Sequence, residues 1–240
     1  MHGRLPGIID IHAHILPGVD DGARDMEESV RMLQEAAEQG ITGVIATPHD
    51  SRRRVPSGYP ALLAELQERI QDRCPGFTLW LGQETCYHEG LAERLKAGQA
   101  FTMAGSRYVL IEFDPGVSYH QLVRGLRQLT EKGYWPILAH IERYRCLKES
   151  GTGELRSMGC KLQMNYESLA GSWLSAEVRW CRRQVTQGAV DFLATDMHRL
   201  DHRPPRTQGA FSWLEGHVSG EDLLRLVRVH AVSVVRGKPF

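Results

Sequence analysis

The strongest constraint on the fold of this chain is an alternation, repeated about seven times, between short apolar segments and segments with helical periodicity. The apolar segments begin at Ile8 and continue over 41–47, 78–84, 108–113, 136–139, 161–165 and 189–195. Nearly continuous apolar strands are typical of a parallel sheet covered by helices. We therefore predict an α/β fold whose strands form a closed or nearly closed barrel.

The segments between the strands carry helix signals. Asp25 resembles an N-cap, with Glu28 three positions later, for a helix that ends at Gly40. Further helices are expected over 60–73, 91–96, 121–131, 176–187, 207–214 and 221–229. The length of 240 residues fits one such domain over 1–240, because α/β barrels often run to roughly 200–250 residues.

Composition excludes several classes of protein. The 29 Lys and Arg residues balance 29 Asp and Glu residues, which argues against nucleic-acid binding. The sequence has neither a long apolar span nor a signal-peptide core, so we expect a cytoplasmic protein without membrane insertion. Its five cysteines lack C-x-x-C spacing and read as reduced thiols. None is followed six positions later by arginine, so the loop of cysteine-dependent phosphatases is missing.

Histidines and carboxylates recur where strands end. His12 and His14 point the same way because successive side chains of a strand alternate between its faces. Asp21 follows the same strand, and the other members of the set stand near the ends of later strands, where β/α barrels carry their active sites. The full set is His12, His14, Asp21, His49, Glu84, Glu112, His140, Asp196 and His198. Buried charges in such number need a cation, so the set predicts two or three metal ions.

The residue types narrow the chemistry. Imidazoles and carboxylates without a thiolate favour Mn²⁺, Fe²⁺, Zn²⁺ or Mg²⁺, and such a cluster suits hydrolysis of phosphoesters. Arg143 and Arg203 follow two of the ligand-bearing strands and could bind phosphate; the alternative is that they pair with Glu142 or Asp201. The run Arg52-Arg53-Arg54 is either a docking site for an acidic substrate or a solvated loop.

From Ile8 onward, these motifs give the chain a family resemblance. They are Ile9-Asp10-Ile11-His12-Ala13-His14-Ile15-Leu16-Pro17 with Asp20-Asp21-Gly22, Ala46-Thr47-Pro48-His49, Gly82-Gln83-Glu84, Leu110-Ile111-Glu112-Phe113, Ala139-His140-Ile141-Glu142-Arg143-Tyr144, and Asp196-Met197-His198 with Leu200-Asp201. The chain resembles the PHP (polymerase and histidinol phosphatase) superfamily, and within it the bacterial manganese-dependent protein-tyrosine phosphatases of the CpsB/YwqE type.

The resemblance implies a distorted (β/α)7 barrel of the PHP, TIM-barrel-like kind, with residues 1–7 as a short N-terminal extension. It also implies three metal ions, usually manganese. The first ion would be bound by His12, His14, Glu84 and Asp196. Glu84 would also bind the second ion, together with Glu112 and His140. The third ion would be bound by Asp21, His49 and His198. Arg143 and Arg203 match the phosphate-binding arginines of the family.

The activity implied is hydrolysis of phosphotyrosine by a metal-bridged hydroxide. The partner implied is the tyrosine-rich tail of a bacterial tyrosine kinase that regulates capsule or exopolysaccharide synthesis, and a homo-oligomer is left open. Asp50 and the Arg/Pro-rich segment 51–59 depart from the family pattern, which bears on substrate choice and on any oligomer contact.

Three other readings compete. A related phosphoesterase, such as a histidinol-phosphate phosphatase, would need a pocket for a small amino alcohol. A non-catalytic PHP module would have no need to hold nine ligand-type residues together. A metal hydrolase of the amidohydrolase type, acting on sugars or amides, is disfavoured by the two arginines suited to phosphate.

Overall fold

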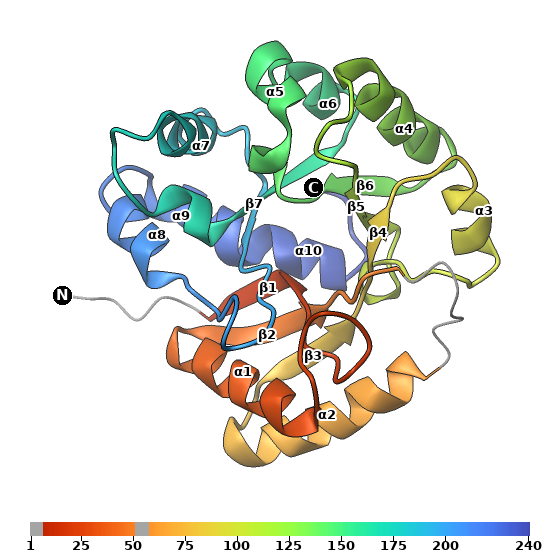
Figure 1. Ribbon diagram of the computed structural model, residues 1–240, viewed down its shortest axis with the longest axis vertical. Helices are drawn as coiled ribbons and strands as arrows, with labels where there is room; N and C mark the ends of the chain where they lie inside the picture. The colour runs from red at the N-terminus through yellow and green to blue at the C-terminus, as the bar shows by residue number, and fades with distance from the viewer. Residues whose placement is uncertain (1–6, 51–57) are drawn as a thin grey trace.

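The computed structural model describes residues 7–50 and 58–240, and within them eight parallel strands form two sheets (Figure 1). The first sheet has the order β1-β2-β3, with bounds Ile8–Ala13, Ile41–Ala46 and Thr78–Leu81. The second has the order β4-β5-β6-β7-β8, with bounds Glu84–Cys86, Tyr108–Glu112, Trp135–Leu138, Lys161–Asn165 and Phe192–Ala194. The predicted parallel α/β fold is therefore confirmed. The run Arg52–Arg54 and residues 1–6 lie outside the described residues.

The predicted single strand over 78–84 is wrong, because the chain passes from one sheet to the other at Gly82. The N–H of Gly82 still donates to Ala46 O of β2 at 2.8 Å, whereas Glu84 pairs with Leu110 of β5. A Cβ atom on Gly82 would lie 2.8 Å from Met103 Sδ. Only glycine fits this close crossing.

A closed barrel is not confirmed, since the strands of the described residues form two sheets rather than one. The sheets nevertheless meet at the C-terminal ends of their strands. Isolated bridges pair Ala13 with Met197 and His49 with Glu84. The N–H of His14 also donates to Met197 O at 2.8 Å. These few contacts bring the C-terminal ends of β1, β2 and β8 together with the beginning of β4.

Most helices lie outside the two sheets, but the last one, α10, lies between them (Figure 1). They are α1 (Met26–Glu38), α2 (Tyr59–Arg73), α3 (Leu91–Lys96), α4 (Tyr119–Glu131), α5 (Arg145–Ser150), α6 (Gly153–Ser157), α7 (Ala176–Thr186), α8 (Gln208–Leu214), α9 (Gly220–Leu224) and α10 (His230–Val235), with a π-helical turn over Arg225–Val229. As predicted, Asp25 caps α1 by accepting from the N–H of Glu28 at 2.8 Å. Helix α4 begins before Gln121 because Ser118 and Gln121 form a capping box. The short helices α5, α6 and α10 were not predicted.

Two layers of apolar side chains hold these elements together. One lies between the sheets and includes Ile11, Ile45, Leu110 and Phe192. The other lies between the strands and the surrounding helices. Burial on both faces explains why the strands read as continuous apolar runs in the sequence.

The C-terminal segment covers the beginning of the second sheet. The O–H of Tyr108 donates to Lys238 O at 3.0 Å, and Lys161 Nζ donates to Phe240 O at 2.6 Å. The ring of Phe240 stacks on His230, with ring centroids 4.1 Å apart. Tyr108 and Lys161 are the first residues of β5 and β7. This segment therefore covers the N-terminal ends of β5 and β7.

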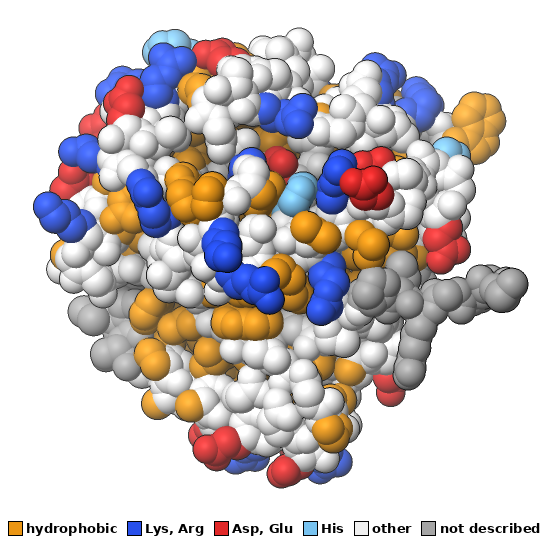
Figure 2. Space-filling model, turned by 180° about the vertical axis from the view of Figure 1, so that it is seen from behind, with side chains coloured by type: hydrophobic (Ala, Val, Ile, Leu, Met, Phe, Trp, Pro, Cys, Tyr) orange, Lys and Arg blue, Asp and Glu red, His pale blue; other side chains and the backbone are white. Residues whose placement is uncertain are grey.

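The surface carries charges of both signs. Seen from behind, lysine and arginine side chains lie among apolar ones across the middle of the face, and acidic side chains lie mainly nearer its margin (Figure 2). Of the helices within 7–50 and 58–240, none combines the length and apolar character needed to cross a membrane.

Candidate metal centre

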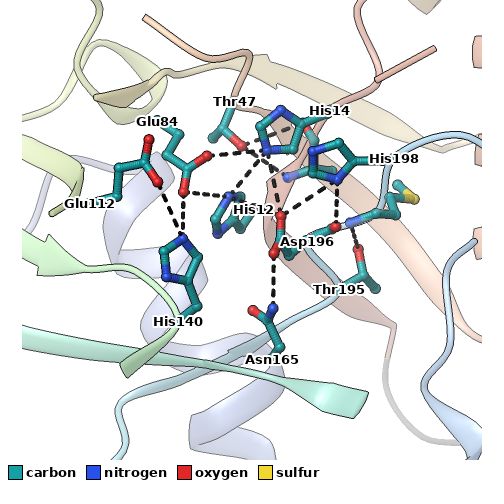
Figure 3. Close-up of polar contacts among 12 residues, drawn as sticks. His12, His14, Thr47, Glu84, Glu112, His140, Asn165, Thr195, Asp196 and His198 are labelled. Atoms are coloured by element: carbon teal, nitrogen blue, oxygen red, sulfur yellow. Dashed lines mark hydrogen bonds and ion pairs between the residues drawn. The ribbon is translucent and has the colours of Figure 1, made fainter. Parts of the chain in front are cut away.

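The nine side chains expected to bind metal gather in one place, and Figure 3 shows seven of them, all but Asp21 and His49, most of them pointing toward one another. His12 belongs to β1 and Glu112 ends β5, whereas His49, His140 and Asp196 follow β2, β6 and β8. Glu84 differs from the prediction, because it begins β4 instead of ending a strand. The crossing at Gly82 is what brings its carboxylate to the same end.

The centre of the site is formed by His12, His14, Glu84 and Asp196, whose side chains are at most 2% exposed. His12 Nε2 lies 3.3 Å from Glu84 Oε1 and 3.5 Å from Asp196 Oδ1. His14 Nε2 lies 3.4 Å from Glu84 Oε2 and 3.3 Å from His12 Nε2. Ligand atoms about 2.1 Å from a shared ion are themselves roughly 3.0–3.4 Å apart, so this spacing fits a metal ion.

Neighbouring residues fix which ring nitrogen of each histidine faces the centre. Asp20 Oδ2 accepts from the backbone N–H of His49 at 2.9 Å and from His14 Nδ1 at 2.8 Å. Gln163 Oε1 accepts from the N–H of His140 at 2.8 Å and from His12 Nδ1 at 3.1 Å. Because both Nδ1 atoms donate to these oxygens, the Nε2 atoms of His12 and His14 face each other and the carboxylates. A proton or a metal ion between them is needed to offset the repulsion of their lone pairs.

The pKa values of these groups also indicate that a positive charge is needed at the centre of the site. Burial lowers the pKa of His14, but its hydrogen bonds to Asp20 and Glu84 and their charges outweigh burial and raise it to about 10. Burial raises the pKa of Asp196, but nearby cationic groups, led by His12, bring it down to about 2. The carboxylates therefore hold a proton on His14 that a metal ion would replace.

Two further groups of ligand atoms adjoin this centre. Asp21 Oδ1 lies 3.4 Å from His49 Nε2 and 3.5 Å from His198 Nε2. The ligand atoms of His14, Asp21, His49 and His198 lie within 4.8 Å of one another. Burial and the charge of His14 lower the pKa of His198 to about 4. His198 is thus neutral at pH 7, as a metal ligand must be.

The other group surrounds Glu84. Glu84 Oε1 lies 2.8 Å from His140 Nε2, and Glu84 Oε2 lies 2.9 Å from His49 Nδ1. Glu112 extends the group, with its carboxylate 3.7 Å from His140 Nε2 and 3.8 Å from His49 Nδ1. Glu84 therefore contacts both the centre and this group, which is the position of a bridging carboxylate.

Asp196 joins the metal centre to the two arginines. Its Oδ1 atom faces the histidines, whereas its Oδ2 atom accepts from Asn165 Nδ2 at 2.9 Å, from Arg203 Nη1 at 2.8 Å and from Arg143. The arginine side chains are 36% and 28% exposed. Neither of the pairings considered from the sequence is found, since Glu142 accepts from Ser168 and Asp201 accepts from Arg24. Both guanidinium groups stand at the rim of the site.

The backbone is strained at two of these ligands. His140 has φ +33° and Asp196 has φ +52°, a region that residues with side chains rarely adopt. Among the described residues, Ala104 is the one other non-glycine residue with positive φ. Such strain persists where the surrounding structure imposes it, and it is concentrated at functional sites.

Sequence reasoning missed the residues that position the ligands. Asp20 was noted only as part of a motif, and Gln163 and Asn165 only as members of a strand. Gln163 Nε2 donates to Asn165 Oδ1 at 2.8 Å, so β7 links His12 to Asp196. The available signal was two buried amides at alternate positions of a strand that is otherwise apolar apart from its first residue, Lys161.

Comparisons with known proteins agree with this geometry. Residues 8–236 match the model of a family described as capsular polysaccharide synthesis, CpsB/CapC. The tyrosine-protein phosphatase CpsB of Streptococcus pneumoniae is 32% identical over 85% of this chain and 88% of its own. The tyrosine-protein phosphatase YwqE of Bacillus subtilis is 32% identical over 89% of this chain and 86% of its own.

A solved structure from work on YwqE of Bacillus subtilis and CpsB of Streptococcus pneumoniae, which are described as metal-dependent tyrosine phosphatases, superposes with a TM-score of 0.87. It shares 30% sequence identity, and the match covers 97% of this chain and 96% of the other. The similarity in fold therefore extends over the strands that carry the metal centre and the helices around them.

Proposed function

This chain belongs to the CpsB/CapC family of capsular polysaccharide synthesis proteins, and from that premise we propose that it is a metal-dependent protein-tyrosine phosphatase. The observation that carries the proposal is the meeting of nine histidines and carboxylates with two arginines at one end of the strands. The reaction is hydrolysis of the phosphate monoester of tyrosine. The missing cysteine loop agrees with a metal-dependent route.

The ligands we propose for the metal ions are the nine residues predicted from the sequence, with Glu84 shared between ions. The metal we propose is manganese, in three positions. Metal ions bound there lower the pKa of water and neutralise charge on a phosphoryl group. The chain's own residues orient the ligands: Asp20 and Gln163 hold His14 and His12, and Asn165 holds Asp196.

Arg143 and Arg203 are the residues we assign to the phosphate. Each guanidinium has some N–H groups on Asp196 and is partly open to solvent. A guanidinium presents several donors in one plane, so it can hold a phosphate oxygen while it stays paired with a carboxylate. Binding at the rim places the phosphate over the buried ligands and screens its charge as the ester bond breaks.

The substrate we propose is a tyrosine-phosphorylated protein, in particular the tyrosine-rich tail of a bacterial tyrosine kinase that regulates capsule synthesis. We also propose that residues 1–240 act as one barrel-like domain, in which the bridges at Ala13 and His49 keep the two sheets in register. Both statements extend the family assignment and are open to test.

The decisive experiment is hydrolysis of a phosphotyrosine peptide by protein stripped with a chelator and then resupplied with Mn²⁺, Mg²⁺ or Zn²⁺. We expect activity to return with Mn²⁺ and histidinol phosphate to be a poor substrate. Turnover of histidinol phosphate in preference to the peptide would replace the tyrosine-phosphatase proposal with the related phosphoesterase. Lack of hydrolysis with every metal would support a non-catalytic module.

A further inference from the structure

A groove of about 490 Å³ opens beside the metal centre, between the C-terminal ends of β4 and β5 and the first half of α4. These three elements lie next to one another in Figure 1. The lining includes Cys86, Tyr87, Phe113, Val117 and Gly125. None of these residues belongs to the proposed ligand set or to the two arginines, so the groove has no role in the reaction described above.

The groove adjoins the backbone of Glu112 in the metal centre. Cys86, at one end of its lining, is paired across β4 and β5 with Glu112, one of the proposed ligands. The N–H of Tyr87 donates to Glu112 O at 2.8 Å. Phe113, which directly follows Glu112, also lines the groove. A polypeptide with its phosphate at the metal centre can therefore reach this groove with a neighbouring side chain.

The walls are aromatic and the polar groups stand at the rim. The rings of Tyr87 and Phe113 stack with centroids 4.9 Å apart. At the rim, Arg124 Nη2 donates to Glu89 Oε1 at 2.9 Å, and Asp114 Oδ1 accepts from the N–H of Gly116 at 2.8 Å. Because these polar groups bind one another, the middle of the groove suits an apolar side chain.

Glycine in α4 is what allows this arrangement. A Cβ atom on Gly125 would lie 2.8 Å from Tyr87 Cε1 and 3.0 Å from Phe113 Cε1. Glycine is disfavoured inside a helix, and here it lets α4 approach the aromatic pair while adding no side chain to the groove.

We propose that this groove is the subsite for an apolar or aromatic side chain that neighbours phosphotyrosine in the substrate polypeptide. The inference rests on the proposed phosphatase function and deepens it, because it makes the enzyme selective for the sequence around the phosphotyrosine. The phosphate group gives affinity at the metal centre, and the groove distinguishes one phosphorylated segment from another.

The test compares kcat/KM of the manganese-loaded protein for three substrates: a phosphotyrosine peptide flanked by leucine or phenylalanine, the same peptide flanked by glycine, and phenyl phosphate. We expect the wild-type protein to prefer the apolar-flanked peptide over the glycine-flanked one by about tenfold, as apolar pockets do for side chains that fit them. This comparison needs no variant.

The variant Gly116→Trp fills the groove from its rim. A Cβ atom there meets only Asp114 Oδ1, at 3.1 Å. We expect the preference for the apolar-flanked peptide over the other two substrates to fall about tenfold. The matched control is Gly220→Trp on α9, where a Cβ atom meets nothing within 4 Å. Its kcat/KM for each of the three substrates should match that of the wild-type protein.

Two outcomes would overturn the inference. One is equal kcat/KM for the two peptides in the wild-type protein. The other is an equal loss on all three substrates in Gly116→Trp, which would assign the groove to the phosphotyrosine ring itself. A wild-type protein that hydrolyses neither peptide would instead refute the proposed phosphatase function, so the two failures are distinguishable.

Discussion

Replacing Asp20 with asparagine should weaken metal binding without removing a proposed ligand. Asp20 is 6% exposed, and its two oxygens face three N–H donors. Oδ2 accepts from His14 Nδ1 at 2.8 Å and from the N–H of His49 at 2.9 Å, and Oδ1 accepts from the N–H of Gly22 at 2.9 Å. An asparagine offers one oxygen and one NH₂ group. In either orientation the NH₂ group points at a donor.

The size of the effect follows from the bond to His14. A hydrogen bond to a charged group contributes about 1.5–3 kcal/mol, which corresponds to roughly 10–100-fold in an equilibrium constant. Loss of a residue that orients a metal ligand costs about the same factor in metal affinity. We therefore expect Asp20→Asn to raise the Mn²⁺ concentration for half-maximal activity by about 10–100-fold.

The assay is a Mn²⁺ titration of phosphotyrosine hydrolysis, with thermal unfolding measured alongside to show that the variant folds. Asp201→Asn is the matched control, because Asp201 pairs with Arg24 at the surface and is 58% exposed. A folded Asp20→Asn protein whose half-saturation stays within about twofold of the wild type would refute this account of the site.

Three further predictions follow from the same geometry. Arg143→Ala should lower kcat/KM for a phosphotyrosine peptide by about 10²-fold, measured at saturating Mn²⁺, whereas retained kcat/KM would remove Arg143 from the phosphate site. The pKa of His14 is raised to about 10, and this proton must leave before a metal ion binds. The affinity for Mn²⁺ should therefore increase about tenfold from pH 7 to pH 8. Mn²⁺ titrations that give the same affinity at both pH values would contradict this prediction. Gly82→Ala should reduce the free energy of unfolding by about 1–3 kcal/mol, because the added methyl group overpacks against Met103. Gly153→Ala is the control, because a Cβ atom there lies in open space, and it should not reduce the free energy of unfolding. Denaturant unfolding of the two variants measures both values.

The sequence alone predicts the parallel α/β fold and the position of the ligand-type residues. The reason is local: a buried parallel strand must be apolar along its length, so a histidine or carboxylate at its end is conspicuous. Parallel strands also bring their C-terminal ends to one edge, so residues such as His12, Glu112 and His140 were expected to meet without any knowledge of contacts.

Tertiary structure alone decided how those residues are held. His12 and Gln163 are 151 positions apart, and Asn165 and Asp196 are 31 apart, so neither pairing leaves a periodic signal in the chain. The crossing at Gly82 depends on the space beside Met103. The shared contact of both arginines with Asp196 depends on how two loops fold over the site. The residue pattern indicates which strands are buried and at which end of a strand a side chain lies. Hydrogen bonds between distant segments form only when the sheets bring those segments together.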